Sequence, residues 1–536
     1  MRRRLLILAC LFALMAPMPG LAAADLSMDT ATDEDIDSAN GLASRDKERV
    51  RQLGRLAEDA PADLPFRRVD GGNGYASIIL PARVDPYTIP ELTIRFPASI
   101  EPLGGDVYLL KDDIIVGMGA NLTISGDRVR ELRLLSEPDR FVTITSWRGA
   151  IDIVGRAWER VRVSSWNPAL NGPDEVLSDG RSWLHTRRGA MSIAWADLDF
   201  LGYATGSLSG VAWEGRAEDP TGGDVTGSSF RYNYFGAYTF EAVDMRWRFN
   251  TFAYNLGYGF DPHDHSDRFL VEFNQAYENG THGIIFSRGC RFNVIRYNRS
   301  FDNGMHGIVL DDGPNLNPDG TVRERPGIAS DDNIVMGNVV TGNEVGIVLD
   351  GGTRNTIAGN LVVGNRYGIR MKDAVSGNVL RSNRLVDNSE FAIYLYNNSN
   401  DNQLTGNTMI GSDSGLVVKD STGNRIDGNV VSTMHRHGIS MSGDVSGTAI
   451  TGNEISDVDM AISLSRAVDA NAVVRDGNTV VREARGDEPL TFWQPVSRWA
   501  FWAAILAIPV LLGPWYTRLF AMIRRISLPG ISRSSA

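Results

Sequence analysis

Residues 338–383, NVVTGNEVGIVLDGGTRNTIAGNLVVGNRYGIRMKDAVSGNVLRSN, carry the pattern that decides the fold. Short runs of Val, Ile and Leu alternate there with turns rich in Asn and Gly, and the pattern then repeats. The small residue that opens one strand of the repeat recurs at Gly283, Gly307, Gly346, Gly368, Ala392, Gly415, Gly438 and Ala461. An asparagine recurs with nearly the same spacing at Asn338, Asn360, Asn383, Asn407, Asn429, Asn453 and Asn478. All but one of the intervals between the small residues are 22–24 residues long.

This period predicts an all-β fold, a right-handed parallel β-helix solenoid in which each repeat is one coil. Asparagine side chains at inward-facing turns can hydrogen-bond from coil to coil and so satisfy buried amides. Leucine-rich repeats have a similar period, but the sequence lacks their leucine signature and helical segment. We expect the solenoid over residues 141–485, with less regular coils before about residue 227. Residues 63–140 contain further strand-like runs, which are either an N-terminal cap or the first strands of the solenoid.

The composition is that of a globular protein. Of the 536 residues, 43% are apolar, 22% are charged and 56 are glycine, which favours many tight turns over long helices. The formal net charge of -12 argues against a nucleic-acid-binding protein, because such proteins usually show a basic footprint. Any polyanionic substrate must therefore meet a local basic patch.

The N-terminus has the pattern of an export signal. Three arginines at positions 2–4 precede an apolar run that ends in small residues, which predicts a signal peptide over residues 1–24. An acidic, partly disordered lead-in is expected over residues 25–62. Removal of the signal peptide takes away Cys10 and leaves Cys290, so no intramolecular disulfide can form.

The C-terminus has the pattern of a membrane anchor. Residues 499–516 contain no charged side chain and carry Trp and Tyr near both ends, which predicts a transmembrane helix; a buried core helix is the alternative. A linker is expected before it, over residues 486–498. The tail at 517–536 carries arginines and no acidic residue, so it should remain in the cytoplasm. Together with the signal peptide, this pattern predicts a periplasmic β-helix anchored to the inner membrane.

A candidate site lies within the repeats, in residues 257–264, GYGFDPHD. Asp261, His263 and Asp264 place three titratable side chains within four residues, and Arg288 follows one repeat later. A histidine beside carboxylates can act as a proton acceptor, because nearby negative charge tunes its basicity around neutral pH.

The repeat converts sequence spacing into proximity, because neighbouring coils of a parallel stack lie ~4.8 Å apart. Aligning the repeat glycines places His263 beside Ser287 and Asp311, and it places Asp264 beside Arg288. Asp261 and His263 are two residues apart, so they lie on the same face of a strand. A histidine, carboxylates and an arginine are therefore expected on one patch of the solenoid wall.

This set of residues suits removal of a proton α to a carboxylate. The carbanion forms beside an existing negative charge, an arginine that holds the carboxylate spreads that charge, and a histidine takes the proton. Catalytic roles are therefore expected for His263, Arg288, Asp261 and Asp264. Substrate-binding roles along the same wall are expected for Tyr258, Glu241, His282, Asp312, Arg370 and Lys372. Ordinary solvated surface is the alternative for the last two. We find no ligand-spaced loop, so we expect neither a metal nor another cofactor.

One interval in the repeat is 39 residues long, between Gly307 and Gly346. It contains an insertion over residues 311–332 that is rich in proline and mixed charges, so a projecting loop is expected there. Long loops on rigid scaffolds are either functional or simply tolerated. Beside the candidate site, this loop is a candidate for a flap that covers substrate.

The motifs GYGFDPHD at 257–264 and THGIIFSR at 281–288 resemble those of the periplasmic mannuronan C5-epimerases. The resemblance extends over about residues 183–312, and the later coils match only as generic repeat. It implies a right-handed β-helix enzyme that converts β-D-mannuronate to α-L-guluronate within the polymer, without calcium. It further implies that His263 is the proton-abstracting base and that Arg288 neutralises the carboxylate.

Two other functions remain compatible with the same features. A polysaccharide lyase begins with the same proton abstraction, and a non-catalytic β-helix could bind or guide polysaccharide during export. The expected partners are an anionic linear polysaccharide, the inner membrane, and a polysaccharide synthesis or secretion complex. Nucleic acid is not expected.

Overall fold

The structure is a computed structural model of the 536-residue chain. It describes residues 67–70, 76–138, 140–203, 206–312 and 329–481, together with positions 41, 48, 51, 52 and 54. The chain divides into two compact units, Met1–Val481 and Arg482–Ala536, and all of the described residues belong to the first. The expected signal peptide, nearly all of the acidic lead-in, and the expected linker, transmembrane helix and tail lie outside the described residues. Among the helices that are described, none has the length and apolar character needed to cross a membrane.

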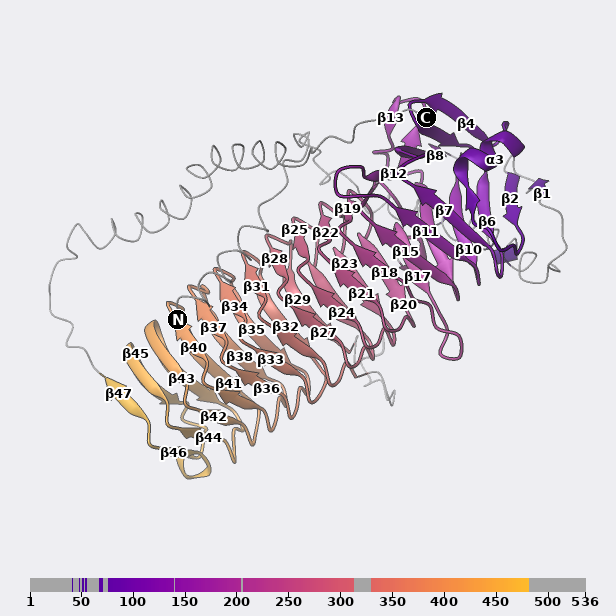
Figure 1. Cartoon of the computed structure of the whole chain (residues 1–536). Helices are drawn as coiled ribbons and strands as arrows, with labels where there is room; N and C mark the ends of the chain where they lie inside the picture. Colours follow the sequence, from indigo (N-terminus) through magenta and orange to yellow (C-terminus); the bar gives the residue numbers. More distant parts are fainter. Residues whose placement is uncertain are drawn as a thin grey trace, which may run out of the picture. The chain divides into compact units, whose positions relative to one another are not determined.

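The described residues form a parallel β-helix, in which each regular coil contributes three short strands (Figure 1). The first strands of successive coils pair in parallel: β2 (Ala76–Leu80), β6 (Asp113–Val116), β10 (Thr143–Trp147), β14 (Trp183–Arg187), β17 (Val211–Glu214), β20 (Ala237–Phe240), β23 (Phe260–His263), β26 (Ile284–Ser287), β29 (His306–Asp311), β32 (Val345–Asp350), β35 (Tyr367–Lys372), β38 (Phe391–Tyr396) and β41 (Ser414–Lys419).

The second strands form a separate sheet: β3 (Tyr87–Thr88), β7 (Asn121–Ser125), β11 (Ala150–Val154), β15 (Ala190–Ala194), β18 (Asp224–Thr226), β21 (Arg246–Arg248), β24 (Leu270–Glu272), β27 (Val294–Arg296), β30 (Ile334–Met336), β33 (Thr356–Ala358), β36 (Val379–Arg381), β39 (Gln403–Thr405), β42 (Arg425–Asp427), β44 (Ala449–Thr451) and β46 (Val474–Asp476).

The third strands complete the coils: β5 (Val107–Leu110), β8 (Glu131–Glu137), β12 (Val161–Asn167), β16 (Ala196–Asp199), β19 (Ser229–Arg231), β22 (Thr251–Ala253), β25 (Gln275–Tyr277), β28 (Arg299–Phe301), β31 (Val339–Thr341), β34 (Leu361–Val363), β37 (Arg384–Val386), β40 (Thr408–Ile410) and β47 (Thr479–Val481). In the last coils, third and first strands merge into the single strands β43 (Val430–Ser442) and β45 (Glu454–Leu464).

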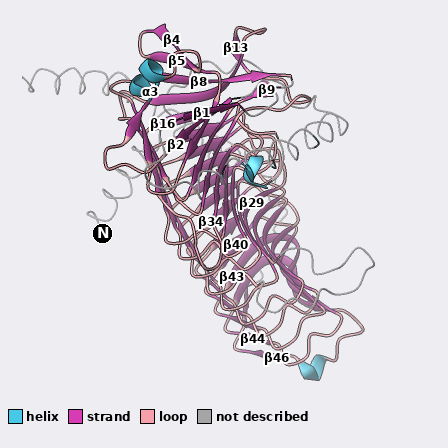
Figure 2. Ribbon diagram, turned by 90° about the vertical axis from the view of Figure 1, so that its right-hand side faces the viewer, coloured by secondary structure: helices cyan, strands magenta, loops and turns pink. Residues whose placement is uncertain are grey.

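The N-terminal end of the stack is more elaborate. Parallel pairing already joins β2 to β6 and β6 to β10, so residues 76–140 contain the first coils of the solenoid. The helix α3 (Ile89–Arg95) follows β3, and Thr88 caps it by accepting from the Glu91 N–H at 3.4 Å. Its buried Ile89 and Leu92 belong to the core. Figure 2 shows α3 at the same end of the stack as β1, β2 and β4, where it can shield the first coil.

A few short elements lie outside the three-strand pattern. They are β1 (Arg67–Asp70), β4 (Ile100–Gly104), β9 (Arg140–Phe141), β13 (Gly172–Pro173) and the 3-10 helices at Gly206–Leu208 and Ala470–Ala472. The first four pair antiparallel with neighbours in the N-terminal part of the stack.

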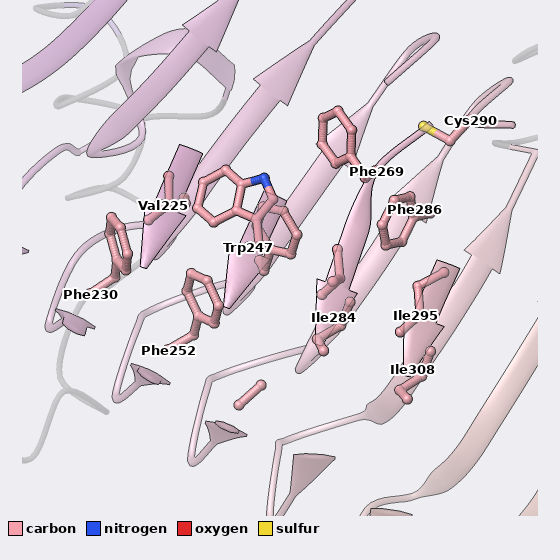
Figure 3. Close-up of a cluster of buried hydrophobic side chains, with 14 of the residues drawn as sticks. Val225, Phe230, Trp247, Phe252, Phe269, Ile284, Phe286, Cys290, Ile295 and Ile308 are labelled. Atoms are coloured by element: carbon pink, nitrogen blue, oxygen red, sulfur yellow. The ribbon is translucent and has the colours of Figure 1, made fainter. Parts of the chain in front are cut away.

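Along each strand, every second side chain points into the interior of the solenoid, and these side chains form the core. Trp247, Phe252 and Phe260 pack together in one part of it, with ring centroids 4.3 Å apart for Trp247 and Phe260 and 5.2 Å apart for Phe252 and Phe260 (Figure 3 shows Trp247 and Phe252). Phe286 and the buried Cys290 continue this core in the next coil. Phe260 opens β23, so the strand that carries the candidate base rests on tightly packed aromatic side chains.

Asparagine ladders connect the coils at their corners, as the sequence predicts. In the longest of them the side-chain Nδ2 of one asparagine donates to Oδ1 of the asparagine one coil later. The ladder runs through Asn250, Asn274, Asn298, Asn338, Asn360, Asn383, Asn407, Asn429, Asn453 and Asn478. Each interior rung also donates to a backbone carbonyl, so buried amide groups are satisfied from coil to coil.

We expect Asn407→Ala to lower the free energy of unfolding by about 3 kcal/mol, because several buried groups lose their partners at once. Asn407 donates to Leu380 O at 2.9 Å and to Asn429 Oδ1 at 3.0 Å, and it accepts from both Asn383 nitrogens. Thermal and urea unfolding followed by circular dichroism would measure the loss. Asn478→Ala is the matched control, because this rung is partly exposed and ends the ladder within the described residues. Equal losses in both variants would contradict the account.

Candidate active site

The outward side chains of the first strands form columns along the solenoid axis. We call the outer surface of β17, β20, β23, β26, β29, β32, β35 and β38 the site face. Interior and exterior positions alternate, so Asp261, which follows the core residue Phe260, points to the site face together with His263. The register pairs Tyr238 with Asp261 and Phe240 with His263.

The register predicted for the candidate site is confirmed. His263 pairs with Ser287, and Ser287 pairs with Asp311 in the following coil. The backbone N–H of His265 donates to Arg288 O at 3.2 Å, which brings the turns after β23 and β26 together.

The turn after β23 brings a histidine, a carboxylate and a guanidinium into contact. His263 Nδ1 hydrogen-bonds to Asp264 Oδ2, and Arg288 Nε lies 3.3 Å from Asp264 Oδ1. Asp264 and Arg288 both have left-handed backbones, with φ of 28° and 59°. Arg288 Nε and His263 thus lie on either side of one carboxylate.

Burial and charge tune the two groups on β23. Burial raises the pKa of Asp261 to about 7, and the charges of Asp311 and Asp264 add to this effect against the opposing charge of His263. The Oδ1 atom of Asp261 is buried and has no hydrogen-bond partner within the described ranges. Burial lowers the pKa of His263, but the hydrogen bond to Asp264 and the charge of Asp261 outweigh it, so the net shift is upward.

A column of stacked rings borders these groups. Tyr258 stacks on His282 with ring centroids 5.1 Å apart, and His282 stacks on His306 at 4.8 Å. Burial raises the pKa of Tyr258 to about 12, so its hydroxyl stays protonated. Burial, together with the charge of Arg370, lowers the pKa of His282 to about 4, so this ring is neutral. Two residues predicted to contact substrate, Tyr258 and His282, thus belong to one stack.

Tyr238 is a site residue that the sequence reasoning missed. Its ring centroid lies 5.9 Å from that of His263, and it is nearly buried beside Asp261. Burial raises the pKa of Tyr238 well above its ordinary value. The repeat contained the signal, because aligning Gly236 with Gly259 places Tyr238 next to Asp261.

The remaining predicted residues lie farther from His263 or engage other partners. Glu241 lies one coil before Asp264, as expected, and its N–H donates to Asp264 O at 2.8 Å. Asp312 accepts a hydrogen bond from the Ser330 N–H at 2.7 Å and so stabilises the backbone at Ser330. Burial raises the pKa of Asp312 to about 7. Lys372 forms ion pairs with Asp350 and, at 3.2 Å, with Asp373.

Arg370, the last of the predicted substrate-binding residues, reaches toward the ring column. Its Nη2 donates to His306 Nε2 at 3.0 Å. The side chain therefore joins the stack that begins at Tyr258 rather than standing alone in solvent.

Two expectations near the site stay predictions. The insertion expected over 311–332 falls almost wholly on residues 313–328, which lie outside the described residues. Across the described part of the chain, no group of three or more His, Cys, Asp or Glu side chains is arranged to hold a metal ion.

Known proteins share this fold and part of this sequence. A family model described as "Right handed beta helix region" matches residues 205–322. A model described as "Periplasmic copper-binding protein (NosD)" matches residues 321–414 and 395–490. The crystal structure of the periplasmic alginate epimerase AlgG superposes with a TM-score of 0.56 at 19% identity, covering 87% of this chain and all of that one. The right-handed parallel β-helix is therefore confirmed.

The curated relatives have a single activity in their names. "Mannuronan C5-epimerase AlgG" of Azotobacter vinelandii is 30% identical over 288 residues, which are 49% of this chain and 53% of that protein. "Mannuronan C5-epimerase" of Pseudomonas putida is 31% identical over 220 residues, 37% of this chain and 39% of that protein. The resemblance to mannuronan C5-epimerases is confirmed. This chain spans about half the length of the first of these relatives and less of the second.

We expect Asp264→Asn to lower the pKa of His263, because it removes the negative charge and the carboxylate acceptor that raise this pKa. NMR titration of the imidazole in both proteins would measure the shift, with the exposed His435 as the internal control. A raised folded-state pKa stabilises the fold below the unfolded value, and this stabilisation is lost as the pH rises through the folded value. The stability advantage of the wild type from this source should therefore shrink above pH 6.5. An unchanged or higher pKa in the variant would contradict the assignment.

Proposed function

We propose that the site catalyses C5-epimerisation of uronate residues within a linear anionic polysaccharide, most directly mannuronate to guluronate in an alginate-like polymer. One observation carries the proposal: His263 and Arg288 contact the same carboxylate, Asp264, and all three side chains are partly exposed on the site face. The names of the curated relatives support it for the part of the chain that they match.

Arg288 would hold the uronate carboxylate. The C5 proton is α to that carboxylate, and removing it places more negative charge on the same group. The shortest contact between Arg288 and Asp264 is made by the Nε of Arg288. The terminal nitrogens of Arg288 would bind the uronate carboxylate in the two-pronged geometry that guanidinium favours. An arginine that binds the transition state more tightly than the ground state lowers the barrier.

His263 would take the C5 proton. Asp264 contacts the Nδ1 atom, so the tautomer with its proton on Nδ1 presents the lone pair of Nε2 to the substrate. Once the proton is transferred, the imidazolium lies between the negative charges of Asp264 and Asp261, which favour the charged ring. A proton from solvent water, delivered to the opposite face of C5, then completes the inversion, and His263 returns its proton to solvent.

The face around the site is suited to a polymer rather than to a single sugar. The first strands stack at ~4.8 Å per coil, so the site face offers a continuous wall along which successive sugars can lie. Arg288, Arg370 and Lys372 supply positive charge on this wall although the net charge of the chain is -12. Arg288 and Lys372 pair with Asp264 and Asp350, so Arg370 is the one of these three cations that no described carboxylate neutralises, and it is the group that would meet a polyanion most directly.

We expect the wild-type protein to incorporate deuterium at C5 of polymannuronate in heavy water without shortening the chains, and His263→Ala to lose this exchange by at least 100-fold. NMR of the polymer would measure exchange, and circular dichroism would confirm folding. His435→Ala is the matched control, because this histidine is exposed and far along the stack. Ultraviolet-absorbing unsaturated ends would indicate a lyase instead, and full exchange by His263→Ala would refute the role of His263.

We also propose that the chain is periplasmic and is tethered to the inner membrane by residues 499–516, where a polysaccharide synthesis or secretion complex would deliver substrate. The uncharged run and the arginine-rich tail support this topology. A periplasm-active reporter fused after Gly486 should be active, and a cytoplasm-active reporter should work after Arg525. The reverse pattern would refute the orientation. Truncation before Trp499 should release the protein from membranes.

A further inference from the structure

Arg370 differs from Arg288 and Arg366 because none of the described carboxylates pairs with it. Arg288 pairs with Asp264, while Arg366 pairs with Glu390 at 2.7 Å. Within the described ranges, the hydrogen bond from Arg370 leads only to His306, and its Nε is buried without any partner.

This arrangement leaves a partly exposed guanidinium with a buried, unsatisfied N–H. Removing a charge from water is costly unless an opposite charge compensates, and an unpaired buried donor adds a further penalty. A surface lysine or arginine in solvent would carry neither penalty. The local structure of Arg370 is therefore that of a side chain matched to an anion.

The ring column fixes where the guanidinium lies. Arg370 belongs to β35, but its Nη2 contacts His306 of β29, two coils back toward the candidate base. Since β29 is itself two coils beyond β23, the guanidinium lies roughly 10 Å along the axis from His263. This distance exceeds the width of one sugar ring, so a group bound at Arg370 belongs to another sugar than the one at His263.

His306 can hold the guanidinium because its ring is neutral. Burial, with smaller contributions from the charges of His282 and Arg370, lowers the pKa of His306 to about 3. A neutral ring that accepts at Nε2 carries its proton on Nδ1 and does not repel the arginine. Stacking on His282, which in turn stacks on Tyr258, fixes the ring in the column.

We propose that Arg370 binds the carboxylate of a second uronate, farther along the polymer than the one that meets His263, and that His306 positions Arg370 for this contact. The inference rests on the proposed function, since it assumes that a polyuronate lies on the site face. It makes Arg370 a specificity residue that distinguishes a polyuronate from a neutral polysaccharide of similar shape.

The test compares the binding of oligomannuronates of increasing length by isothermal titration calorimetry, using the full chain. In the wild type we expect the affinity to rise steeply at the shortest oligomer that is long enough to reach Arg370; we call this rise the step. Arg370→Gln should remove the step, which should be about 10- to 100-fold in affinity for a charge-assisted hydrogen bond. Affinity for shorter oligomers should be the same in both proteins.

Three further variants isolate the contact. Arg370→Lys keeps the charge and should retain part of the step, and it serves if the glutamine variant fails to fold. His306→Phe keeps a stacked ring without the acceptor, so it should reduce the step. Arg366→Gln is the matched control, because this arginine lies in the same coil, is exposed and already pairs with Glu390.

The outcomes separate this inference from the proposed function. If Arg370→Gln keeps the step, or loses affinity equally at every length, the second-uronate site is wrong. Deuterium exchange by the wild type would then still support epimerisation. If the step depends on Arg370 but the wild type shows no exchange, the carboxylate site is supported and the proposed reaction is refuted.

Discussion

Coil-to-coil hydrogen bonding at the asparagine corners is the interaction on which the rest of the structure depends. Each interior asparagine of the ladder donates to a backbone carbonyl and to the next asparagine, so buried amides are satisfied only when the coils are stacked in one register. A slip of one residue would expose core side chains and break every rung. The ladder therefore sets which residues, in most coils 22–24 apart in the sequence, become neighbours in space.

The candidate site uses this fixed register. Asp264 and Arg288 are 24 residues apart, and the stacking brings their side chains to 3.3 Å. A packed aromatic core beneath β23 supports the strand from inside, so the outward groups are held on a rigid wall. For the proposed epimerisation, such rigid placement of His263 and Arg288 would lower the cost of reorganisation during the reaction. The interaction that stabilises the solenoid would then also preorganise the proposed site.

Much of this arrangement can be predicted from the sequence, because in a solenoid the backbone neighbours follow from the period. The pairing of His263 with Ser287, and the contact between Asp264 and Arg288, follow from aligning the repeat glycines. The period does not specify side-chain rotamers or the choice of counter-ions. The period therefore does not indicate that Asp312 accepts a hydrogen bond from the Ser330 N–H, or that Lys372 forms an ion pair with Asp350.

The period places His282 and His306 next to one another, because each directly precedes a repeat glycine. It does not specify whether the two rings are solvated or stacked, since burial decides between these. The rings of His282 and His306 are largely buried, neutral and stacked with their centroids 4.8 Å apart, and His306 accepts a hydrogen bond from Arg370.

The most direct test of the central claim is a crystal structure of the His263→Asn variant with a bound oligomannuronate. The account predicts that the polymer lies along the site face, with the C5–H of one sugar directed at residue 263 and its carboxylate hydrogen-bonded to the terminal nitrogens of Arg288. A polymer bound on another face of the solenoid, or a carboxylate turned away from Arg288, would contradict it.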